Sequence, residues 1–399
     1  MSRAAGRTLA RPTPSTAIDA MQRGAHVLRN SRLGRRADPA DVFNLDLHIA
    51  VVGDVGVELD RRGVSLTSWC LSAHAWVFDR SVEPVAFVNE RTWFSFGPRM
   101  VRRFQRAYGS ALESFRGYLA TYPPCFALLY RGLGKPTLAV AATRYEWPFT
   151  RNAQLWDWLD EGLREGVAEG WLTLAANNRA DADYVANYTG LKPAYIPSGC
   201  AYIAPTYTGR LRPAVVAAAS ERLAAEICQE LRQEAVPLRT ALGRRYTWAQ
   251  LYDHRAIVLI PYNVSIMSLF EHYSACAPVY VPDRTFLKHL MATHPREVLS
   301  SLSFSQVIQQ PAAKRGARDL NDLRDGDVVD WYLDRADFYD ADWMPQLRLF
   351  ESWSHLDHLL ATDDHLAISY GMAAEKTERL RRIAALWDEL DWLDTLATR

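Results

Sequence analysis

The chain has 399 residues, of which 49% are hydrophobic, and its 46 basic residues balance its 46 acidic residues. This length suits two domains of moderate size and a short tail, and the composition excludes a largely disordered chain. Because the charges balance, no global field attracts polyanions, so any affinity for nucleic acid or a membrane must be local. The sequence contains no apolar run of about 18 residues or more, the length that spans a bilayer.

The five cysteines are scattered along the chain, odd in number and without a C-x-x-C spacing. They are Cys70, Cys125, Cys200, Cys228 and Cys276. This pattern argues against a disulfide framework and against a structural zinc site. We therefore expect a protein of a reducing compartment, the cytoplasm.

Residues 1–41 form a separate segment rich in arginine. Eight arginines precede Asp38, and Asp19 is the only acidic residue in the same stretch. This composition predicts a flexible basic tail. Three alternatives stay open for it: a solvated tail, an organelle-targeting segment, or an arm that binds anionic lipid or the phosphates of a nucleic acid.

From residue 42 onward, short apolar runs alternate with segments of helical spacing. The first run, residues 47–52, leads into a glycine turn at residues 53–56 that carries Asp54. Further strands are expected at residues 64–69, 126–130, 137–141, 171–176 and 194–196, and helices at 99–120 and 153–169. Alternating strands and helices imply a parallel sheet covered on both faces, the doubly wound α/β class.

A second α/β series follows a linker at residues 202–213. Strands are expected at residues 214–219, 236–239, 256–261 and 278–282, and helices at 221–234 and 269–275. Beyond residue 373, apolar residues recur at helical spacing among charges, which predicts a C-terminal amphipathic helix that packs on the protein. The expected order is a basic tail (1–41), two Rossmann-like domains facing a cleft (42–208 and 209–370) and the terminal helix (371–399).

The most informative segment of the second domain is residues 260–282. A strand end is followed by a polar loop with Ser265, a helix with Ser268 and Glu271, then Pro278 and an apolar strand. A serine-rich loop at a helix N-terminus offers backbone N–H groups and hydroxyls to a diphosphate. A glutamate in the first turns of such a helix can accept hydrogen bonds from both ribose hydroxyls. The segment therefore indicates a nucleotide site centred on Glu271.

This segment resembles the donor segment of GT-B glycosyltransferases, which has the form S-x-x-E, then a small residue, then P-V-x-x. Ser268 and Glu271, followed by Ala275 and by Pro278 with Val279, match that form. Many retaining members carry a second acid eight residues before the glutamate, and this chain has Asn263 there. The resemblance therefore points to nucleotide-sugar binding and leaves the stereochemistry of transfer open.

The resemblance implies a glycosyltransferase that moves a hexosyl or pentosyl group from a UDP- or GDP-linked sugar to a hydroxyl acceptor. The acceptor is a glycan or a modified nucleic-acid base, and no metal or other cofactor takes part. The donor is expected to contact Glu271, Ser268, Met267, Ser265 and Tyr262. Asp181 and Asp183, which form a D-x-D pattern, fall within an expected helix and do not suggest a metal site.

Cationic and aromatic groups of the second domain complete the expected donor site. Arg239, at the expected end of a strand, is placed to neutralise the leaving diphosphate, with Arg222 and Arg244 as alternatives. Trp248 is the candidate for stacking on the nucleobase, although it is equally suited to the core.

On the acceptor side, an inverting transferase needs a general base, and the first domain offers three. Asp54 and His74 follow the first two expected strands, and Glu146 follows the strand at residues 137–141. Asp54 also suits a purely structural role in its turn, and a lone histidine is often structural. Asn177 and Asn178 are expected either to bind a polyol acceptor or to cap a helix.

Two other classes of function remain as alternatives. A nucleotide-sugar 2-epimerase shares the scaffold and the diphosphate site but needs no second acceptor. A non-catalytic protein that binds nucleic acid through its basic tail is the other alternative.

Overall fold

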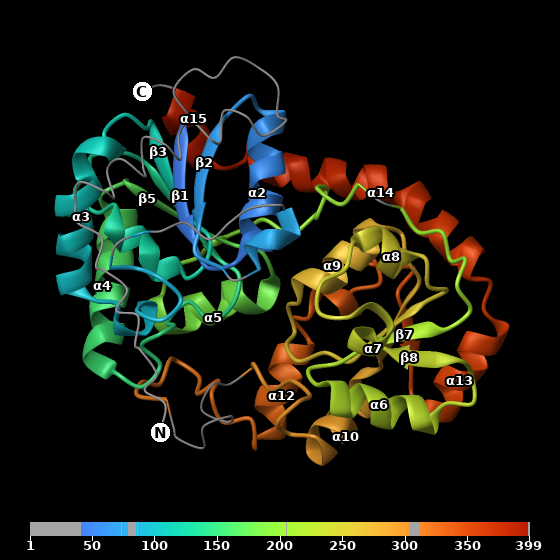
Figure 1. Cartoon of the computed structure of the whole chain (residues 1–399). Helices are drawn as coiled ribbons and strands as arrows, with labels where there is room; N and C mark the ends of the chain where they lie inside the picture. The colour runs from blue at the N-terminus through green and yellow to red at the C-terminus, as the bar shows by residue number, and fades with distance from the viewer. Residues whose placement is uncertain are drawn as a thin grey trace, which may run out of the picture.

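The computed structural model describes residues 41–72, 74–78, 85, 87–204, 206–302 and 312–397. The expected basic tail therefore lies outside the described residues, apart from Asp41. Within the described residues no helix is both long and apolar enough to cross a membrane. Figure 1 shows two α/β domains side by side and a long helix, α14, that joins them.

The first domain is built on a six-stranded parallel sheet with the order β2-β1-β3-β4-β5-β6. Its strands are β1 (Val42–Asp46), β2 (Leu66–Cys70), β3 (Gly117–Ala120), β4 (Thr137–Ala141), β5 (Leu172–Ala176) and β6 (Ala194–Tyr195). The helices are α2 (Ile49–Arg61), α3 (Pro98–Leu112), α4 (Ala153–Ala168) and α5 (Arg179–Thr189), with short 3-10 helices η1 (Ala75–Phe78), η2 (Trp93–Ser95) and η3 (Pro124–Leu129). Helices α2 and α3 lie on opposite faces of the sheet (Figure 1), so its central strands are buried on both faces.

The second domain holds a five-stranded parallel sheet with the order β11-β10-β9-β7-β8. Its strands are β7 (Ala214–Ala217), β8 (Ala235–Pro237), β9 (Ile257–Leu259), β10 (Val279–Pro282) and β11 (Arg348–Phe350). The helices are α6 (Glu221–Glu230), α7 (Leu238–Leu242), α8 (Trp248–Tyr252), α9 (Met267–Ser274), α10 (Arg284–Thr293), α12 (Gly326–Leu333) and α13 (Trp353–Thr362), with the 3-10 helix η4 (Asp337–Tyr339). The two parallel sheets confirm the predicted fold class of two Rossmann-like α/β domains.

The C-terminal helices return to the first domain. Helix α14 (His365–Asp388) runs from the second domain past α2, and α15 (Asp391–Ala397) follows it (Figure 1). Arg116, just before β3, donates a hydrogen bond to the carbonyl oxygen of Leu396, and Trp392 is buried. The predicted C-terminal amphipathic helix is therefore present and packs on the protein, where it spans both domains.

Three predicted elements of the first domain are wrong. Within the expected strand at 47–52, helix α2 begins at Ile49, because Val51, Val52, Val55 and Leu59 bury one helical face. The strand lies just upstream at Val42–Asp46. The expected helix at 99–120 ends at Leu112, and Gly117–Ala120 form β3. In place of the expected strand at 126–130, residues 126–129 belong to η3 and Tyr130 follows as its C-cap.

Candidate active site

Helix α9 carries the predicted donor motif and faces the first domain. Its N-cap residue, Ile266, supplies no side-chain cap. Met267, the first residue of the helix, is buried, and its sulfur lies 3.6 Å from Asn177 Nδ2 and 3.5 Å from Ser198 Oγ. Asn177 directly follows β5. The N-terminus of α9 therefore meets the edge of the first sheet at which its strands end.

The remaining residues of the predicted donor loop surround this helix end. Ser265 and Ser268 are half-buried, and Tyr262 is exposed. Asn263, which stands where many retaining enzymes have an acid, accepts a hydrogen bond from the N–H of Val264 at 2.8 Å. The loop thus leaves two hydroxyls and one phenol near the start of α9.

Glu271 lies in the second turn of α9 and is held by one specific contact. The hydroxyl of Tyr202 donates a hydrogen bond of 2.6 Å to its Oε1. Burial raises the pKa of Glu271 to about 7, and the nearby charge of Asp54 adds to the increase. The hydrogen bond from Tyr202 opposes it. Both protonation states of the side chain are therefore accessible near neutral pH.

Aromatic and cationic groups gather around Glu271. The rings of Tyr202 and Trp248 lie 5.8 Å apart, and each also packs against Phe78 of the first domain. Burial raises the pKa of Tyr246, Glu271 raises it further and Arg239 lowers it, so these three side chains are electrostatic neighbours. The structure therefore brings Arg239 and Trp248 toward Glu271.

The placement of Arg239 corrects one expectation. Strand β8 ends at Pro237, and Arg239 is an exposed residue of the short helix α7 that follows it. The alternative Arg222 forms ion pairs with Glu226 and Glu297, and the alternative Arg244 is exposed. Arg239 is thus the candidate next to Tyr246.

The first domain contributes a histidine that the sequence analysis missed. His48 comes two residues after β1, and its backbone N–H donates to Asp46 Oδ1 at 2.6 Å. Its Nδ1 is buried and has no hydrogen-bond partner among the described residues. Burial lowers the pKa of His48 to about 4, so the ring is neutral at pH 7. If β1 had been predicted at residues 42–46, His48 would have been a candidate, because functional residues gather just beyond the carboxyl ends of parallel strands.

His74 and Tyr122 lie beside His48. The pKa of His48 is lowered a little further by His74, which is exposed in the segment after β2. The ring of Tyr122, which follows β3, lies 5.7 Å from the His48 ring. Tyr122 also interacts electrostatically with Tyr262 of the second domain. These side chains therefore connect the ends of β1, β2 and β3 with the donor loop.

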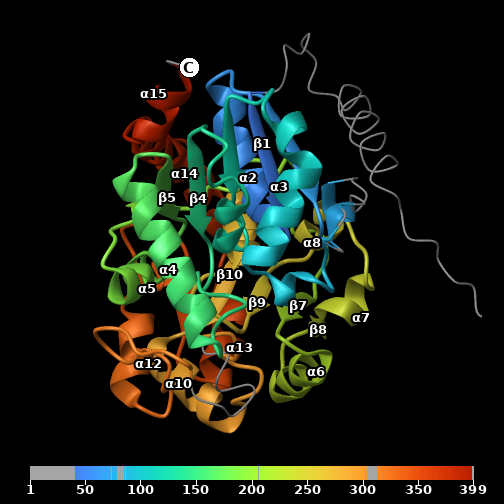
Figure 2. The ribbon, with the colours of Figure 1, turned by 90° about the vertical axis from the view of Figure 1, so that its left-hand side faces the viewer.

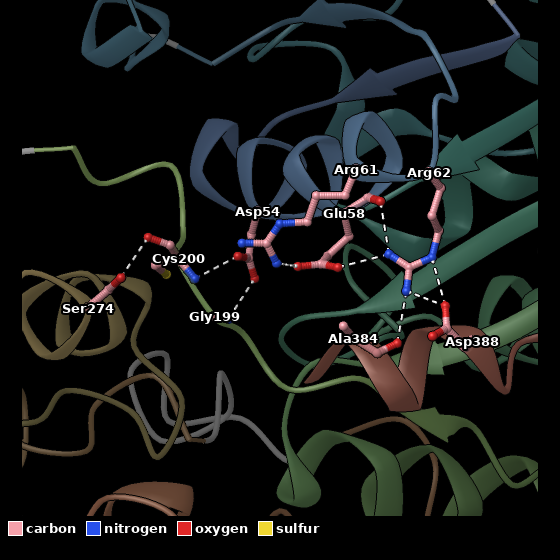
Figure 3. Close-up of polar contacts among 9 residues, drawn as sticks. All are labelled: Asp54, Glu58, Arg61, Arg62, Gly199, Cys200, Ser274, Ala384 and Asp388. Atoms are coloured by element: carbon pink, nitrogen blue, oxygen red, sulfur yellow. Dashed lines mark hydrogen bonds and ion pairs between the residues drawn. The ribbon is translucent and has the colours of Figure 1, made fainter. Parts of the chain in front are cut away.

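Asp54 has a different setting from the one expected. It lies in helix α2 rather than in a glycine turn, and its carboxylate accepts hydrogen bonds from the N–H groups of Gly199 (3.2 Å) and Cys200 (2.6 Å). Ser274 of α9 donates to the carbonyl oxygen of Cys200 at 3.0 Å (Figure 3). The chain just before the linker is thus held from both domains at Cys200, and both oxygens of Asp54 are engaged in holding it.

This contact predicts a loss of stability in Asp54→Ala. The change leaves two buried backbone N–H groups without their acceptor, and we expect a cost of about 1–3 kcal/mol. A lower thermal midpoint by calorimetry checks it. Asp60→Ala, an exposed carboxylate of the same helix, is the matched control and should leave the midpoint nearly unchanged. Equal midpoints for the two variants would contradict the role of Asp54 at the linker.

Glu146 is fully buried beside Arg144 at the end of β4. Its Oε1 accepts hydrogen bonds from Thr150 (3.2 Å) and Tyr184 (3.3 Å), while Oε2 has no partner among the described residues. Burial raises the pKa of Glu146 to about 7, although Arg144 opposes the increase. Arg144 also donates to the carbonyl oxygen of Ser301 in the second domain at 2.5 Å. This cluster therefore belongs to the contact between the domains.

The two asparagines after β5 have separate roles. Asn178 caps α5 by accepting a hydrogen bond from the N–H of Asp181 at 2.8 Å, so the helix-capping alternative holds for it. Asn177 donates to Ser198 Oγ at 3.0 Å and faces Met267. Asn177 thus lies at the contact between the domains.

Comparison with known proteins gives weak structural matches only. No protein-family model matches this sequence, and no curated protein matches it. The solved structure of the glycotransferase of kitacinnamycin is 12% identical, with a TM-score of 0.45 over 90% of this chain and 100% of that one. The spinosyn forosaminyltransferase SpnP is 11% identical, with a TM-score of 0.43 over 87% of this chain and 100% of that one. SnogD, a glycosyltransferase from Streptomyces nogalater, is 13% identical, with a TM-score of 0.40 over 87% of this chain and 98% of that one.

Proposed function

We propose that this protein is a glycosyltransferase that uses a nucleoside-diphosphate sugar. The observation that carries the proposal is the meeting of two sets of side chains at the carboxyl ends of two parallel sheets, where α/β domains bind ligands. Glu271, Tyr246 and Arg239 lie on one side. On the other side lies a neutral His48, whose Nδ1 has no hydrogen-bond partner among the described residues.

The donor half suits a nucleotide. Tyr202 occupies only Oε1 of Glu271, which leaves Oε2 for a ribose hydroxyl. Tyr246 and Trp248 supply flat rings for a uracil or guanine base, and Arg239 supplies positive charge for the diphosphate. Ser265, Ser268 and the uncapped start of α9 supply further donors to the diphosphate, so its charge needs no metal ion in this proposal.

The acceptor half suits proton transfer from a hydroxyl. A neutral imidazole can accept a proton at a nitrogen that has no partner among the described residues, and we assign this role to His48. His74 stays a candidate because it lies beside His48. Asp54 already accepts hydrogen bonds from the backbone amides of Gly199 and Cys200. Glu146 is enclosed by Arg144, Thr150 and Tyr184, which favours a positioning role over contact with the acceptor.

Binding of nucleoside diphosphates tests the donor half. UDP or GDP should raise the thermal midpoint, because a ligand that binds only the folded state stabilises it by mass action. Glu271→Ala should weaken this binding about 10- to 100-fold, through loss of a charged hydrogen bond to ribose. Titration calorimetry measures the effect.

The control for Glu271→Ala is Glu230→Ala, an exposed acid at the end of α6. It should bind the nucleotide as the unchanged protein does. If neither UDP nor GDP binds, or if Glu271→Ala binds normally, the donor site is misassigned. If a nucleotide sugar is converted to an epimer without any acceptor, the protein is an epimerase and the transferase proposal fails.

A further inference from the structure

Helix α3 presents a row of arginines on the outer side of the first domain. Val101, Phe104, Tyr108 and Leu112 bury its inner face. Arg99, Arg102, Arg103 and Arg106 are all exposed, at the spacing i, i+3, i+4 and i+7 that places them on one face. Residues 98–112 contain no acid. Among the described residues, none of these four arginines forms an ion pair.

Two further features accompany this row: an exposed ring shortly before α3 in the chain and a hollow along the helix. Phe94, four residues before α3, exposes 59% of its surface, which is a large fraction for an aromatic side chain. Arg102, Gln105 and Arg106 line an open hollow of about 360 Å³. Gln105 is fixed there because its Nε2 donates to the carbonyl oxygens of Leu129 (3.2 Å) and Arg131 (2.7 Å). The α3 surface, meaning Phe94 with these four arginines, thus combines positive charge, an apolar ring and a concavity.

We propose that the α3 surface docks on a membrane of anionic lipid. Figure 2 shows α3 on the outside of its domain, away from the second domain, so the helix can lie along a flat surface. Arginines near an anionic bilayer gain electrostatic attraction, and the hollow between Arg102 and Arg106 accepts a phosphate headgroup. The Phe94 ring enters the boundary between headgroups and acyl chains. A nucleic-acid duplex would use the arginines but would give this ring no apolar environment.

The docked face adjoins the proposed acceptor side. Trp93, which precedes Phe94, lies with its ring 6.1 Å from Trp147 and 6.3 Å from Tyr122. Tyr122 in turn packs beside His48. Docking through α3 therefore places the acceptor side next to the bilayer. The binding itself is independent of the proposed transferase activity.

Sedimentation of the full chain with lipid vesicles tests the proposal. Vesicles of phosphatidylcholine mixed with phosphatidylglycerol should bind the protein, and vesicles of phosphatidylcholine alone should not. The triple variant R99Q/R102Q/R106Q should bind the anionic vesicles roughly 100-fold more weakly. Phe94→Ala should weaken binding by about tenfold. Binding should fall as salt is raised, because screening reduces the attraction.

The matched control is R315Q/R324Q/R381Q, which removes the same charge from three exposed arginines that are paired with Asp319, Asp322 and Glu378. It should bind vesicles normally. Both variants keep the arginine-rich residues 1–36, so the comparison isolates α3. Equal loss in both variants, or no loss in either, overturns the proposal. Binding of an RNA or DNA duplex that depends on α3, without vesicle binding, overturns it in favour of a nucleic acid.

Discussion

Replacing His48 by alanine is expected to lower kcat for sugar transfer by about 10²- to 10⁴-fold, the usual contribution of a general base. The imidazole lies just after β1, its buried Nδ1 has no partner among the described residues, and burial holds its pKa at about 4. It is therefore already neutral at pH 7, and it can take up the proton of an acceptor hydroxyl as that proton becomes acidic during transfer. Its loss removes an interaction with the reacting atoms and leaves the donor site intact.

Steady-state kinetics with a UDP- or GDP-sugar and a hydroxyl acceptor measure this effect. Binding of the nucleoside diphosphate to His48→Ala should match that of the unchanged protein. His74→Ala is the comparison variant, since exposed His74 is the other candidate base at the same edge. A greater loss in His74→Ala than in His48→Ala would transfer the role of base to His74. Because the pKa of His48 is about 4, its protonation should not lower kcat/KM between pH 8 and pH 5.5.

The fold class could be predicted from the sequence because buried parallel strands leave a strong pattern. Strands such as Thr137–Ala141 and Ala214–Ala217 are short apolar runs between helical segments, and the structure has them where they were expected. The pattern failed at residues 47–52. A run of Val and Ile is typical of a strand, but here tertiary packing makes it the buried face of α2. Short apolar runs alone do not distinguish these cases.

The candidate site was predictable in part. Glu271 and its loop stood out because a local motif carries them, and the structure places Arg239 and Trp248 nearby. His48 was missed because its position depends on where β1 ends. The hydrogen bond between Tyr202 and Glu271 joins residues 69 positions apart, so no local sequence pattern predicts it. The hydrogen bond from the N–H of Cys200 to Asp54 joins residues 146 positions apart and likewise could not be predicted from a local pattern.

Glu146→Gln is expected to stabilise the protein at pH 8 by about 3 kcal/mol and to change little near pH 4.5. Burial raises the pKa of this carboxyl from 4.5 to about 7 in the folded protein. Between these values the folded chain binds more protons than the unfolded chain, so stability falls as pH rises through the window. Above pH 7 the folded protein carries the full cost of a buried charge, and glutamine removes that cost while its carbonyl oxygen still accepts from Thr150 and Tyr184.

Thermal midpoints of both proteins across pH 4.5 to 8 test this expectation. The unchanged protein should lose stability toward pH 8. Asp54 and Asp181 contribute to the same loss, because burial raises their pKa values to about 6. Glu161→Gln, an exposed acid of α4, should follow the unchanged protein. If Glu146→Gln is instead less stable at pH 8, then Glu146 is ionised and Arg144, 4.0 Å away, compensates its charge. In that case the pair is a true ion pair holding the two domains, because Arg144 also reaches Ser301.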